Sequence, residues 1–251
     1  MAARQLPDLD DQPLNRVAFL MSHVGRIRAT NEDACALSSA DERLTSWQGP
    51  IDCSGGWALL ADGMGGHAAG EVASALAIEI LRPMMPALRT DRDIAEAIST
   101  ADTALYLAME RYPACHGMGT TIAGVLMADE ETIIFNTGDS RIYALCGNSL
   151  RLLSNDDVVD GNMLTQCLGG AQEQIGLAPH IVRFRFQAST ALLLCSDGLS
   201  DMLSDTDIAR ILNRRPANPA AALVDAAIEA GGHDNVSVIV IDRLPECQPE
   251  H

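Results

Sequence analysis

The sequence lacks the features of a secreted or membrane protein. Its seven cysteines are odd in number and include no C-x-x-C pair. No secretory apolar segment precedes them, and no apolar run approaches the roughly 18 residues that span a bilayer. These absences argue against a disulfide framework and against a membrane anchor. We therefore expect a cytoplasmic protein with reduced thiols.

Basic residues are scarce. The chain has 17 Lys and Arg against 34 Asp and Glu, which gives a formal net charge of -17 at pH 7. Nucleic-acid binding requires clustered Lys or Arg, so this charge argues against a nucleic-acid partner. Most of the acidic residues are expected to form a solvated surface, and only a few to act as ligands.

No Pro- or Ser-rich linker divides the chain. Its 251 residues, 47% of them hydrophobic, are enough for one large core. We expect a single domain over residues 17–243, a disordered N-terminal segment over residues 1–16, and a C-terminal tail over residues 244–251.

Strand patterns dominate the expected domain. Apolar runs rich in β-branched residues predict strands at residues 57–61, 120–127, 132–136, 141–145, 181–186, 191–195 and 236–241. Short turns at residues 129–130 and 146–149 predict hairpins, which require antiparallel neighbours. Residues 41–56 are expected to be irregular.

Helices are predicted between these strands. Apolar residues at helical spacing predict helices over residues 71–81 and 91–112. A third helix is expected to begin at a Ser204 cap, and a fourth at Asn218 with Pro219 in its first position. Long helices beside hairpin-rich strands indicate an α+β sandwich.

Four aspartates stand where an apolar strand pattern meets a Gly-rich turn. They are Asp62, Asp139, Asp197 and Asp234. Strands that end in a carboxylate carry it to the edge of a sheet, where glycines allow backbone carbonyls and water to approach a cation. Oxygen-only ligands favour magnesium or manganese over zinc. The pattern predicts one shared metal site.

A cysteine nucleophile is not supported. Four residues separate Cys146 from Arg151, one fewer than in the phosphate loop of cysteine-dependent phosphatases. Cys195 follows the apolar run 191–194, so packing explains it better than reactivity.

Seven short motifs occur in a fixed order along the chain. They are R-A-T-N-E-D at 28–33, D-G-M-G-G-H at 62–67, G-T-T at 119–121, G-D-S-R at 138–141, L-T-Q-C-L-G at 164–169, S-D-G-L at 196–199 and H-D-N-V-S at 233–237. Each alone is weak evidence, because such turns occur by chance. Together, from about residue 17 to 242, the sequence resembles the bacterial form of the metal-dependent protein phosphatases of the 2C type.

This resemblance implies a four-layer αββα fold, with two antiparallel sheets between outer helices and a binuclear Mg2+ or Mn2+ centre at one edge. By position, Asp62 would bridge the two ions and the Gly63 carbonyl would bind the first. Asp197 and Asp234 would bind the second, and Glu32 would hold a metal through water.

The resemblance also implies a weaker third metal site, with Asp139 as its ligand and Asp197 shared. A metal-bridged hydroxide would attack phosphoserine or phosphothreonine in line, without a covalent intermediate. The expected partners are phosphorylated proteins and a cognate bacterial Ser/Thr kinase.

Arg28 occupies the family's phosphate-binding position. A guanidinium suits two phosphoryl oxygens at once. Arg26 would lie on the same face if this segment were a strand, as a neighbouring contact. Alternatively, both arginines neutralise the acidic cleft, or pair with Glu32 and Asp33.

Asp33 and Asp201 are expected to support the site without binding metal directly. Asp33 could orient Arg28 or bound water, or could bond the local backbone. Asp201 could reach the third metal, or could cap a helix at its entrance. His67 could donate a proton, although a structural role is favoured.

The chain departs from the family pattern in two places. Some members have a histidine as candidate general acid where this chain has Met64, so protonation of the leaving group has no assigned residue. Relatives usually carry a flap a few tens of residues long, whereas residues 154–162 are nearly all of it here. A reduced flap should open the cleft and alter substrate choice more than chemistry.

Three functions compete. The retained aspartates favour an active protein phosphatase over a catalytically weak module that binds phosphoproteins through the same cleft. A regulator acting on an anti-sigma-factor antagonist is the third. Relatives of that branch generally lack the Arg28 motif, so its presence counts against this reading.

Overall fold

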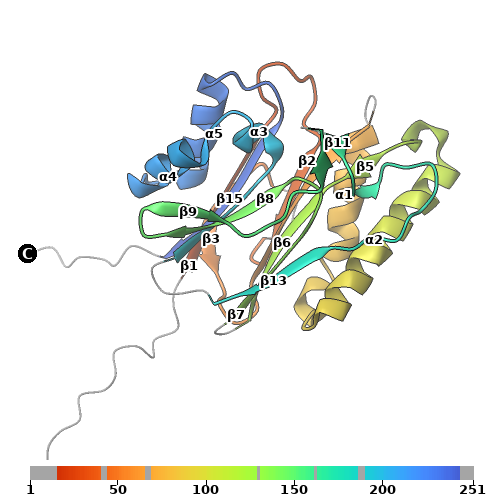
Figure 1. Ribbon diagram of the computed structural model, residues 1–251, viewed down its shortest axis with the longest axis horizontal. Coiled ribbons are helices and arrows are strands. Elements are labelled where there is room, and N and C mark those ends of the chain that lie inside the picture. The colour runs from red at the N-terminus through yellow and green to blue at the C-terminus, as the bar shows by residue number, and fades with distance from the viewer. Residues whose placement is uncertain are drawn as a thin grey trace, which may run out of the picture.

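The strands form two large antiparallel sheets with helices outside them (Figure 1). The computed structural model describes residues 16–40, 44–65, 69–128, 131–160, 163–185 and 190–243. The predicted tail 244–251, the turn at 129–130 and His67 lie outside these residues. So does the predicted N-terminal segment, except for Arg16, which begins the first strand.

The first sheet has the strand order β3-β1-β15-β14-β8-β9. Its strands are β1 (Arg16–His23), β3 (Ser46–Ile51), β8 (Arg141–Cys146), β9 (Ser149–Leu152), β14 (Thr190–Cys195) and β15 (Val236–Arg243). β1 pairs antiparallel with β15 over its whole length, from Arg16↔Arg243 to His23↔Val236. The first and last described strands are therefore direct neighbours.

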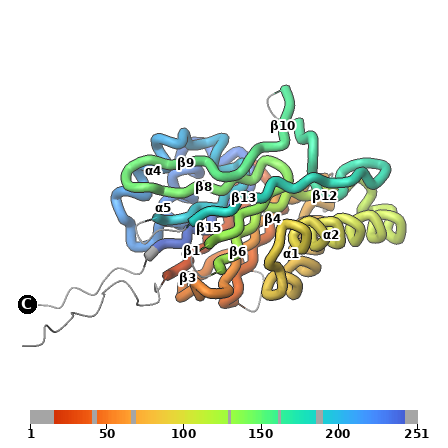
Figure 2. Tube along the Cα trace, turned by 60° about the horizontal axis from the view of Figure 1, so that its bottom comes forward, coloured from red at the N-terminus to blue at the C-terminus, as the bar shows by residue number. Residues whose placement is uncertain are grey.

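The second sheet has the order β12-β5-β4-β6-β7-β13, with β2 also paired to β4. Its strands are β2 (Asp33–Leu37), β4 (Trp57–Met64), β5 (Gly119–Thr120), β6 (Ile122–Ala128), β7 (Glu131–Thr137), β12 (Leu168–Gly169) and β13 (His180–Phe184). A separate small hairpin joins β10 (Val158–Val159) to β11 (Met163–Leu164). This hairpin stands above the sheets in Figure 2.

Helices cover the outer face of each sheet. α1 (Ala69–Leu81) and α2 (Asp91–Arg111) pack on the second sheet, with the short 3-10 turns η1 (Met85–Ala87) and η2 (Pro113–Cys115) beside them. α3 (Asp197–Ser200), α4 (Asp205–Asn213) and α5 (Pro219–Glu229) lie on the first sheet. Figure 1 shows these helix groups on opposite sides of the strands. The predicted four-layer αββα sandwich is confirmed.

Three apolar layers hold the sandwich together. Leu60 and Leu192 lie between the sheets. Their chain neighbours point the other way: Leu59 packs under α1 and α2, and Leu193 packs under α4 and α5. Successive side chains of a strand point to opposite faces, so a strand covered on both sides reads as a continuous apolar run.

The predicted helix starts are confirmed. The Ser204 side chain accepts a hydrogen bond from the backbone N–H of Asp207, and the Asn218 side chain accepts one from Ala221. Thr90 begins α2 with a reciprocal capping box. These side chains bond N–H groups that have no partner within the helix. No helix in the described residues is long and apolar enough to cross a membrane.

The prediction that residues 41–56 are irregular was wrong for β3. This strand pairs with β1 at the edge of the first sheet, with Pro50 opposite Val17. Its exposed and partly buried residues alternate, as expected where one face meets solvent. An edge position tolerates Pro50 because an edge strand leaves some of its N–H groups unpaired. The glycine and proline in β3 are uncommon in strands, so the sequence pattern did not predict one here.

The sandwich brings distant acidic residues to one edge. Glu32 immediately precedes β2, Asp62 lies near the end of β4, and Asp139 precedes β8. Asp197 follows β14 as the first residue of α3, and Asp234 precedes β15. Antiparallel neighbours from both sheets therefore present these side chains at the same end of the fold.

Candidate metal centre

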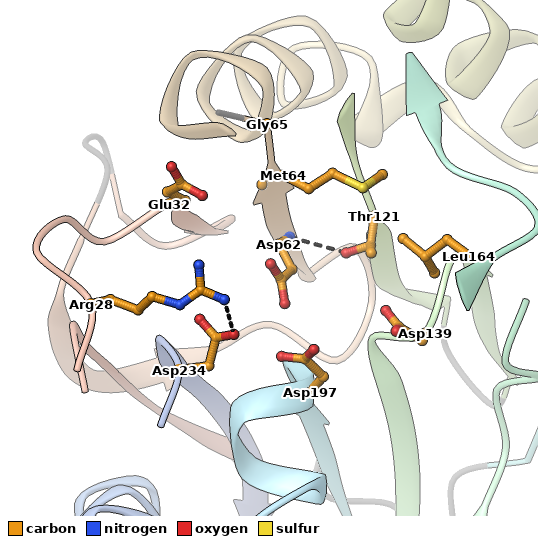
Figure 3. Close-up of a pocket in the computed structure, with 11 residues that line it drawn as sticks. Arg28, Glu32, Asp62, Met64, Gly65, Thr121, Asp139, Leu164, Asp197 and Asp234 are labelled. Atoms are coloured by element: carbon orange, nitrogen blue, oxygen red, sulfur yellow. Dashed lines mark hydrogen bonds and ion pairs between the residues drawn. The ribbon is translucent and has the colours of Figure 1, made fainter. Parts of the chain in front are cut away.

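These acidic side chains surround a single pocket at the sheet edge (Figure 3). The pocket has a volume of about 200 Å³. Its lining residues are Arg28, Glu32, Asp62, Gly63, Met64, Gly65, Thr121, Asp139, Leu164, Asp197 and Asp234. Every residue expected to bind metal or phosphate is among them. Asp33 and Asp201, expected in supporting roles, are not.

Asp62 lies at the centre of the acidic group. Its backbone N–H donates to Thr121 Oγ1 at 3.0 Å, which fixes the strand end that carries it. Burial raises the pKa of Asp62 well above its usual range, and the charges of Asp33, Asp197 and Asp139 add to this effect. A carboxylate in this position is costly unless a proton or a cation neutralises it.

Asp33 is buried directly opposite Asp62, as its register partner on β2. Its Oδ2 accepts a hydrogen bond from Ser196 Oγ at 3.0 Å. Burial raises the pKa of Asp33 to about 6. Like charges opposite each other across a strand pair are destabilising, so this pair also favours a nearby cation. No hydrogen bond joins Asp33 to Arg28 in the described residues.

Asp197 and Asp139 form the other side of the pocket. Burial raises the pKa of Asp197 to about 7, and the charges of Asp139 and Asp234 contribute. Burial also raises the pKa of Asp139. Asp201 contributes to both shifts through its charge, but it stands at the C-terminal end of α3. The alternative that Asp201 caps a helix entrance was therefore wrong.

Arg28 is the cationic group of the pocket. Its Nη2 donates to Asp234 Oδ2 at 2.5 Å, and its side chain is 52% exposed. This hydrogen bond raises the pKa of Arg28. Arg28 thus pairs with Asp234, and not with Glu32 or Asp33 as one alternative held. Burial raises the pKa of Glu32.

Arg26 does not share a strand face with Arg28. It lies exposed in a turn, and its backbone N–H donates to Gly232 O at 2.7 Å. Because this segment is not a strand, Arg26 is not the neighbouring contact that a shared strand face would have made it. It does not line the pocket.

Asn235 holds the loop that carries Arg28, a role that sequence reasoning missed. Its Nδ2 donates to Val24 O and Thr30 O, each at 2.9 Å. Its Oδ1 accepts from the backbone N–H of Glu32 at 2.8 Å. One side chain next to Asp234 thus satisfies three backbone groups of a loop distant in sequence. The H-D-N-V-S motif contained this residue, but no local pattern revealed its partners.

Gly63 permits a close approach of three backbone segments. A Cβ added at Gly63 would lie 2.6 Å from Glu32 O and closer still to the carbonyl oxygen of Gly70 in α1. Its N–H donates to the same Glu32 oxygen at 3.2 Å. The absence of a side chain therefore lets the Glu32 loop and α1 pack against the strand end beside Asp62.

The lining residues fit a divalent cation by their chemistry. They supply hard oxygen donors from five carboxylates, and crowding of like charges is a cause of the raised pKa values of Asp62 and Asp197. Within the described residues, no three of these side chains are close enough together to hold one metal ion. The Asp234 carboxylate instead forms an ion pair with Arg28. The volume exceeds that of several water molecules, so ions could bind with waters completing their coordination.

The buried thiols are unsuited to nucleophilic attack. Cys195 is fully buried in the layer between the first sheet and its helices. Burial raises its pKa to about 12, so almost no thiolate exists near neutral pH. Cys195 is a packing residue, as its sequence context predicted.

Comparisons with known proteins identify the same family. The protein phosphatase 2C family model matches residues 29–228. The serine/threonine phosphatase Stp of Listeria welshimeri is 31% identical, over 87% of this chain and 92% of the relative. PstP of Mycobacterium tuberculosis is 34% identical, over 87% of this chain and 43% of the relative.

Solved structures agree with this assignment. The crystal structure of M. tuberculosis PstP/Ppp matches with a TM-score of 0.76 and 30% identity, over 92% of this chain and all of the other. The PstP catalytic domain in complex with two manganese ions matches with a TM-score of 0.76 and 31% identity, over the same shares. The pocket, the fold and these relatives agree: the chain belongs to the protein phosphatase 2C family in its bacterial form, and is a protein phosphatase that depends on manganese or magnesium.

Proposed function

We propose that this enzyme hydrolyses phosphoserine and phosphothreonine in proteins and opposes a bacterial Ser/Thr kinase. The observation that carries the proposal is the arrangement of Asp62, Asp139, Asp197 and Asp234 around one pocket that also contains Arg28. The Stp and PstP relatives are serine/threonine phosphatases, which supports this choice of substrate.

The proposed metal ligands are those that the family resemblance implies, and all of them line the pocket. Asp62 would bridge two ions, the Gly63 carbonyl would bind the first, and Asp197 and Asp234 would bind the second. When bound, the ions supply an activated water and offset negative charge on the phosphoryl oxygens. Glu32 would hold a metal-bound water, and Asp139 would hold a weaker third ion with Asp197.

Arg28 is proposed to bind the substrate phosphoryl group. Its half-exposed guanidinium lines the pocket and uses Nη2 to bond Asp234. A guanidinium has five N–H donors in a planar fork, so others are free for two phosphoryl oxygens. Asn235 holds the loop that carries Arg28 next to the acidic residues, through its hydrogen bonds to the backbone on either side of Arg28.

Two apolar side chains, those of Met64 and Leu164, also line the pocket. Met64 stands where some relatives have a histidine, and it lines the pocket without offering a proton. Leu164, which follows the reduced flap at the end of the β10–β11 hairpin, forms part of the pocket wall. We propose that this short hairpin leaves room for folded protein substrates. Replacing it with a relative's full flap should change discrimination among phosphoproteins.

The test is hydrolysis of a phosphothreonine peptide with and without Mn2+. The wild type should be active with Mn2+ and silent in excess EDTA. Asp62→Asn keeps the shape of the side chain but removes its charge, and should lower kcat by about 10²- to 10³-fold or more. Asp225→Asn, an equivalent change on the exposed face of α5, is the matched control and should leave kcat unchanged.

The alternative is a catalytically weak module that binds phosphoproteins through the same pocket. The retained acidic residues favour the enzyme, because binding a dianion does not require them. A wild type that binds the phosphothreonine peptide without turning it over in Mn2+ would support the module. Asp62→Asn with full turnover would refute the proposed site.

A further inference from the structure

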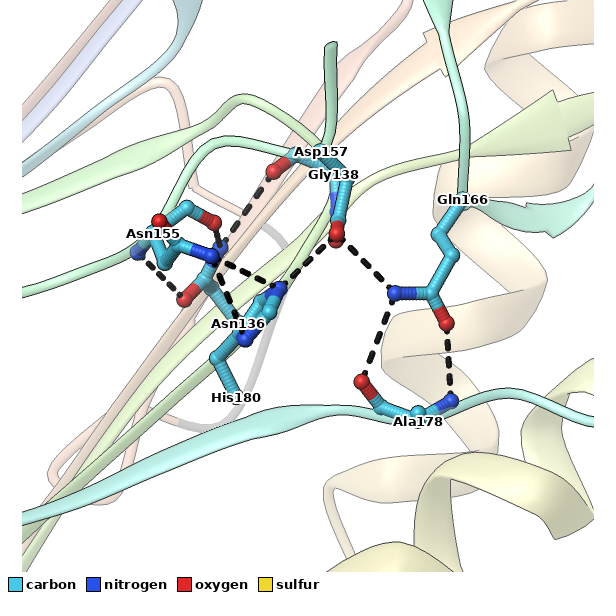
Figure 4. A network of polar contacts seen from close by, with 7 residues as sticks. All are labelled: Asn136, Gly138, Asn155, Asp157, Gln166, Ala178 and His180. Carbon is cyan, nitrogen blue, oxygen red and sulfur yellow. Dashed lines mark hydrogen bonds and ion pairs between the residues drawn. The ribbon is translucent and has the colours of Figure 1, made fainter.

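The Asp157 carboxylate is the centre of a buried polar network beside the pocket (Figure 4). Its Oδ2 accepts a hydrogen bond from the backbone N–H of Gly138 at 2.9 Å. Its Oδ1 accepts from Gln166 Nε2 at 2.9 Å and lies 2.8 Å from His180 Nε2. Both oxygens therefore have hydrogen-bond partners, although Asp157 does not itself line the pocket.

The backbone of Asp157 contacts the same segments. Its N–H donates to Gly138 O at 3.1 Å, and its carbonyl accepts from the N–H of Thr165 at 2.8 Å. Gly138 is thus bound by Asp157 through both its N–H and its C=O. The same carbonyl also accepts from Asn136 Nδ2 at 3.3 Å, so Asp157 is the residue that binds Gly138 on both sides of its peptide and Asn136 adds one contact.

Gly138 directly precedes Asp139, the residue proposed to hold the third metal ion. Its φ is +103°, a conformation that glycine adopts and other residues rarely do. An added Cβ would lie 2.6 Å from Thr121 Cγ2, so the turn is packed closely against Thr121. The direction in which the Asp139 side chain leaves the backbone therefore depends on how the Gly138 peptide is held.

The same residue anchors the small hairpin. Asp157 immediately precedes β10, and its partners Thr165 and Gln166 immediately follow β11. Asp157 therefore joins the two ends of the hairpin by hydrogen bonds. Leu164, at the end of β11, lines the pocket on the same side as Asp139 (Figure 3).

We propose that Asp157 is a positioning residue, which aims the Asp139 carboxylate into the pocket by holding Gly138 and keeps Leu164 beside it by holding the base of the hairpin. The inference rests on the proposed function, because the metal-binding role of Asp139 belongs to that proposal. It adds that a residue outside the pocket sets the metal requirement of the enzyme.

The neighbouring Asp156 provides a matched control. Its carboxylate bonds Arg141 at 2.7 Å and makes no hydrogen bond to Gly138. Asp156→Asn therefore removes an equivalent charge one residue away and leaves the Gly138 contacts in place. The Asp156 charge is one cause of the raised pKa of Asp139, so this variant measures the effect of a lost charge on the metal requirement, and it should leave the exchange of the Gly138 amide unchanged.

The test compares Asp157→Ala, Asp157→Asn and Asp156→Asn with the wild type. In metal-free protein, the Gly138 amide should exchange with solvent at least about tenfold faster in Asp157→Ala, because its acceptor is lost. The Thr121 amide, which bonds Asp62 O, is an internal reference and should not change. Both amides are followed by NMR.

The second measurement is the Mn2+ concentration that gives half-maximal turnover, together with direct Mn2+ binding by calorimetry. Asp157→Ala should raise this concentration about tenfold or more, with a smaller change in kcat at saturating Mn2+. Asp157→Asn should recover part of the loss, because its amide oxygen can still accept from Gly138. A merely structural role would lower the melting temperature without moving the Mn2+ requirement.

Unchanged Gly138 exchange, or an unchanged Mn2+ requirement in Asp157→Ala, would overturn the proposal. If Asp157→Ala does not fold, Asp157→Asn must give intermediate values of both quantities, and wild-type values would refute the idea. A wild type without phosphatase activity would refute the proposed function instead. Amide exchange and calorimetric Mn2+ binding would still decide the role of Asp157.

Discussion

Gly63→Ala tests whether close packing of backbone at the strand end is needed for the metal centre. The new Cβ would lie 2.6 Å from Glu32 O, whereas ordinary contact begins at 3.4 Å. The Glu32 loop must therefore move by about 0.8 Å, and the first turn of α1 must move further because the Gly70 carbonyl oxygen would lie closer still. Neither obstacle is a flexible side chain.

This shift should affect both stability and activity. Forcing an extra methyl into a packed region costs about 1–3 kcal/mol, which for a chain of this size lowers Tm by about 2–12 °C. Misplacing catalytic groups by about 1 Å can reduce the rate 10²-fold. We expect kcat/KM on a phosphothreonine peptide to fall by about that factor, with a higher Mn2+ requirement.

The matched control is Gly55→Ala, because a Cβ added there would meet nothing within 4 Å. That variant should keep wild-type kcat/KM, and its Tm should stay the same or rise slightly. The measurements are thermal unfolding in EDTA and steady-state kinetics over a Mn2+ series. If Gly63→Ala matched Gly55→Ala in both, the packing argument for the site would be refuted.

Three further changes probe other parts of the molecule. Asp139→Ala should raise the Mn2+ concentration for half-maximal activity about tenfold and change saturated kcat less; an unchanged Mn2+ titration would argue against its assignment. Iodoacetamide at pH 8 should alkylate the exposed Cys146 but not the buried Cys195, whose pKa is raised to about 12, and activity should survive; mass-spectrometric mapping that links Cys195 modification to inactivation would contradict this. Thr90→Ala should lower the free energy of unfolding by about 1 kcal/mol in urea titrations and leave kcat unchanged, since it removes the α2 cap; full stability would mean that the cap contributes nothing.

Local chemistry made the helices predictable. Caps such as Ser204 and Asn218 act within three residues, so the signal and its consequence are close in sequence. The buried strands were also predictable, because strands such as β14 are covered on both faces and read as continuous apolar runs. The residues that the motifs singled out as metal or phosphate ligands all line one pocket.

Features that depend on distant partners were not predictable. β3 forms an edge strand only because β1 supplies its hydrogen bonds, and its own residues favour a loop. The three backbone contacts of Asn235 reach residues more than 200 positions away. The pairing of Arg28 with Asp234 likewise joins opposite parts of the chain. No pattern within a short window contains such information.

The pairing of β1 with β15 governs when the enzyme can become active during its synthesis. Arg28 follows the first of these strands and Asp234 precedes the second, so the pocket is incomplete until the residues up to Asp234 have left the ribosome. Such a long loop closure is slow, and it gives the nascent protein a period without hydrolytic capacity. The same adjacency places Arg16 beside Arg243, so a short linker could join the ends of β1 and β15 and new termini could be opened elsewhere.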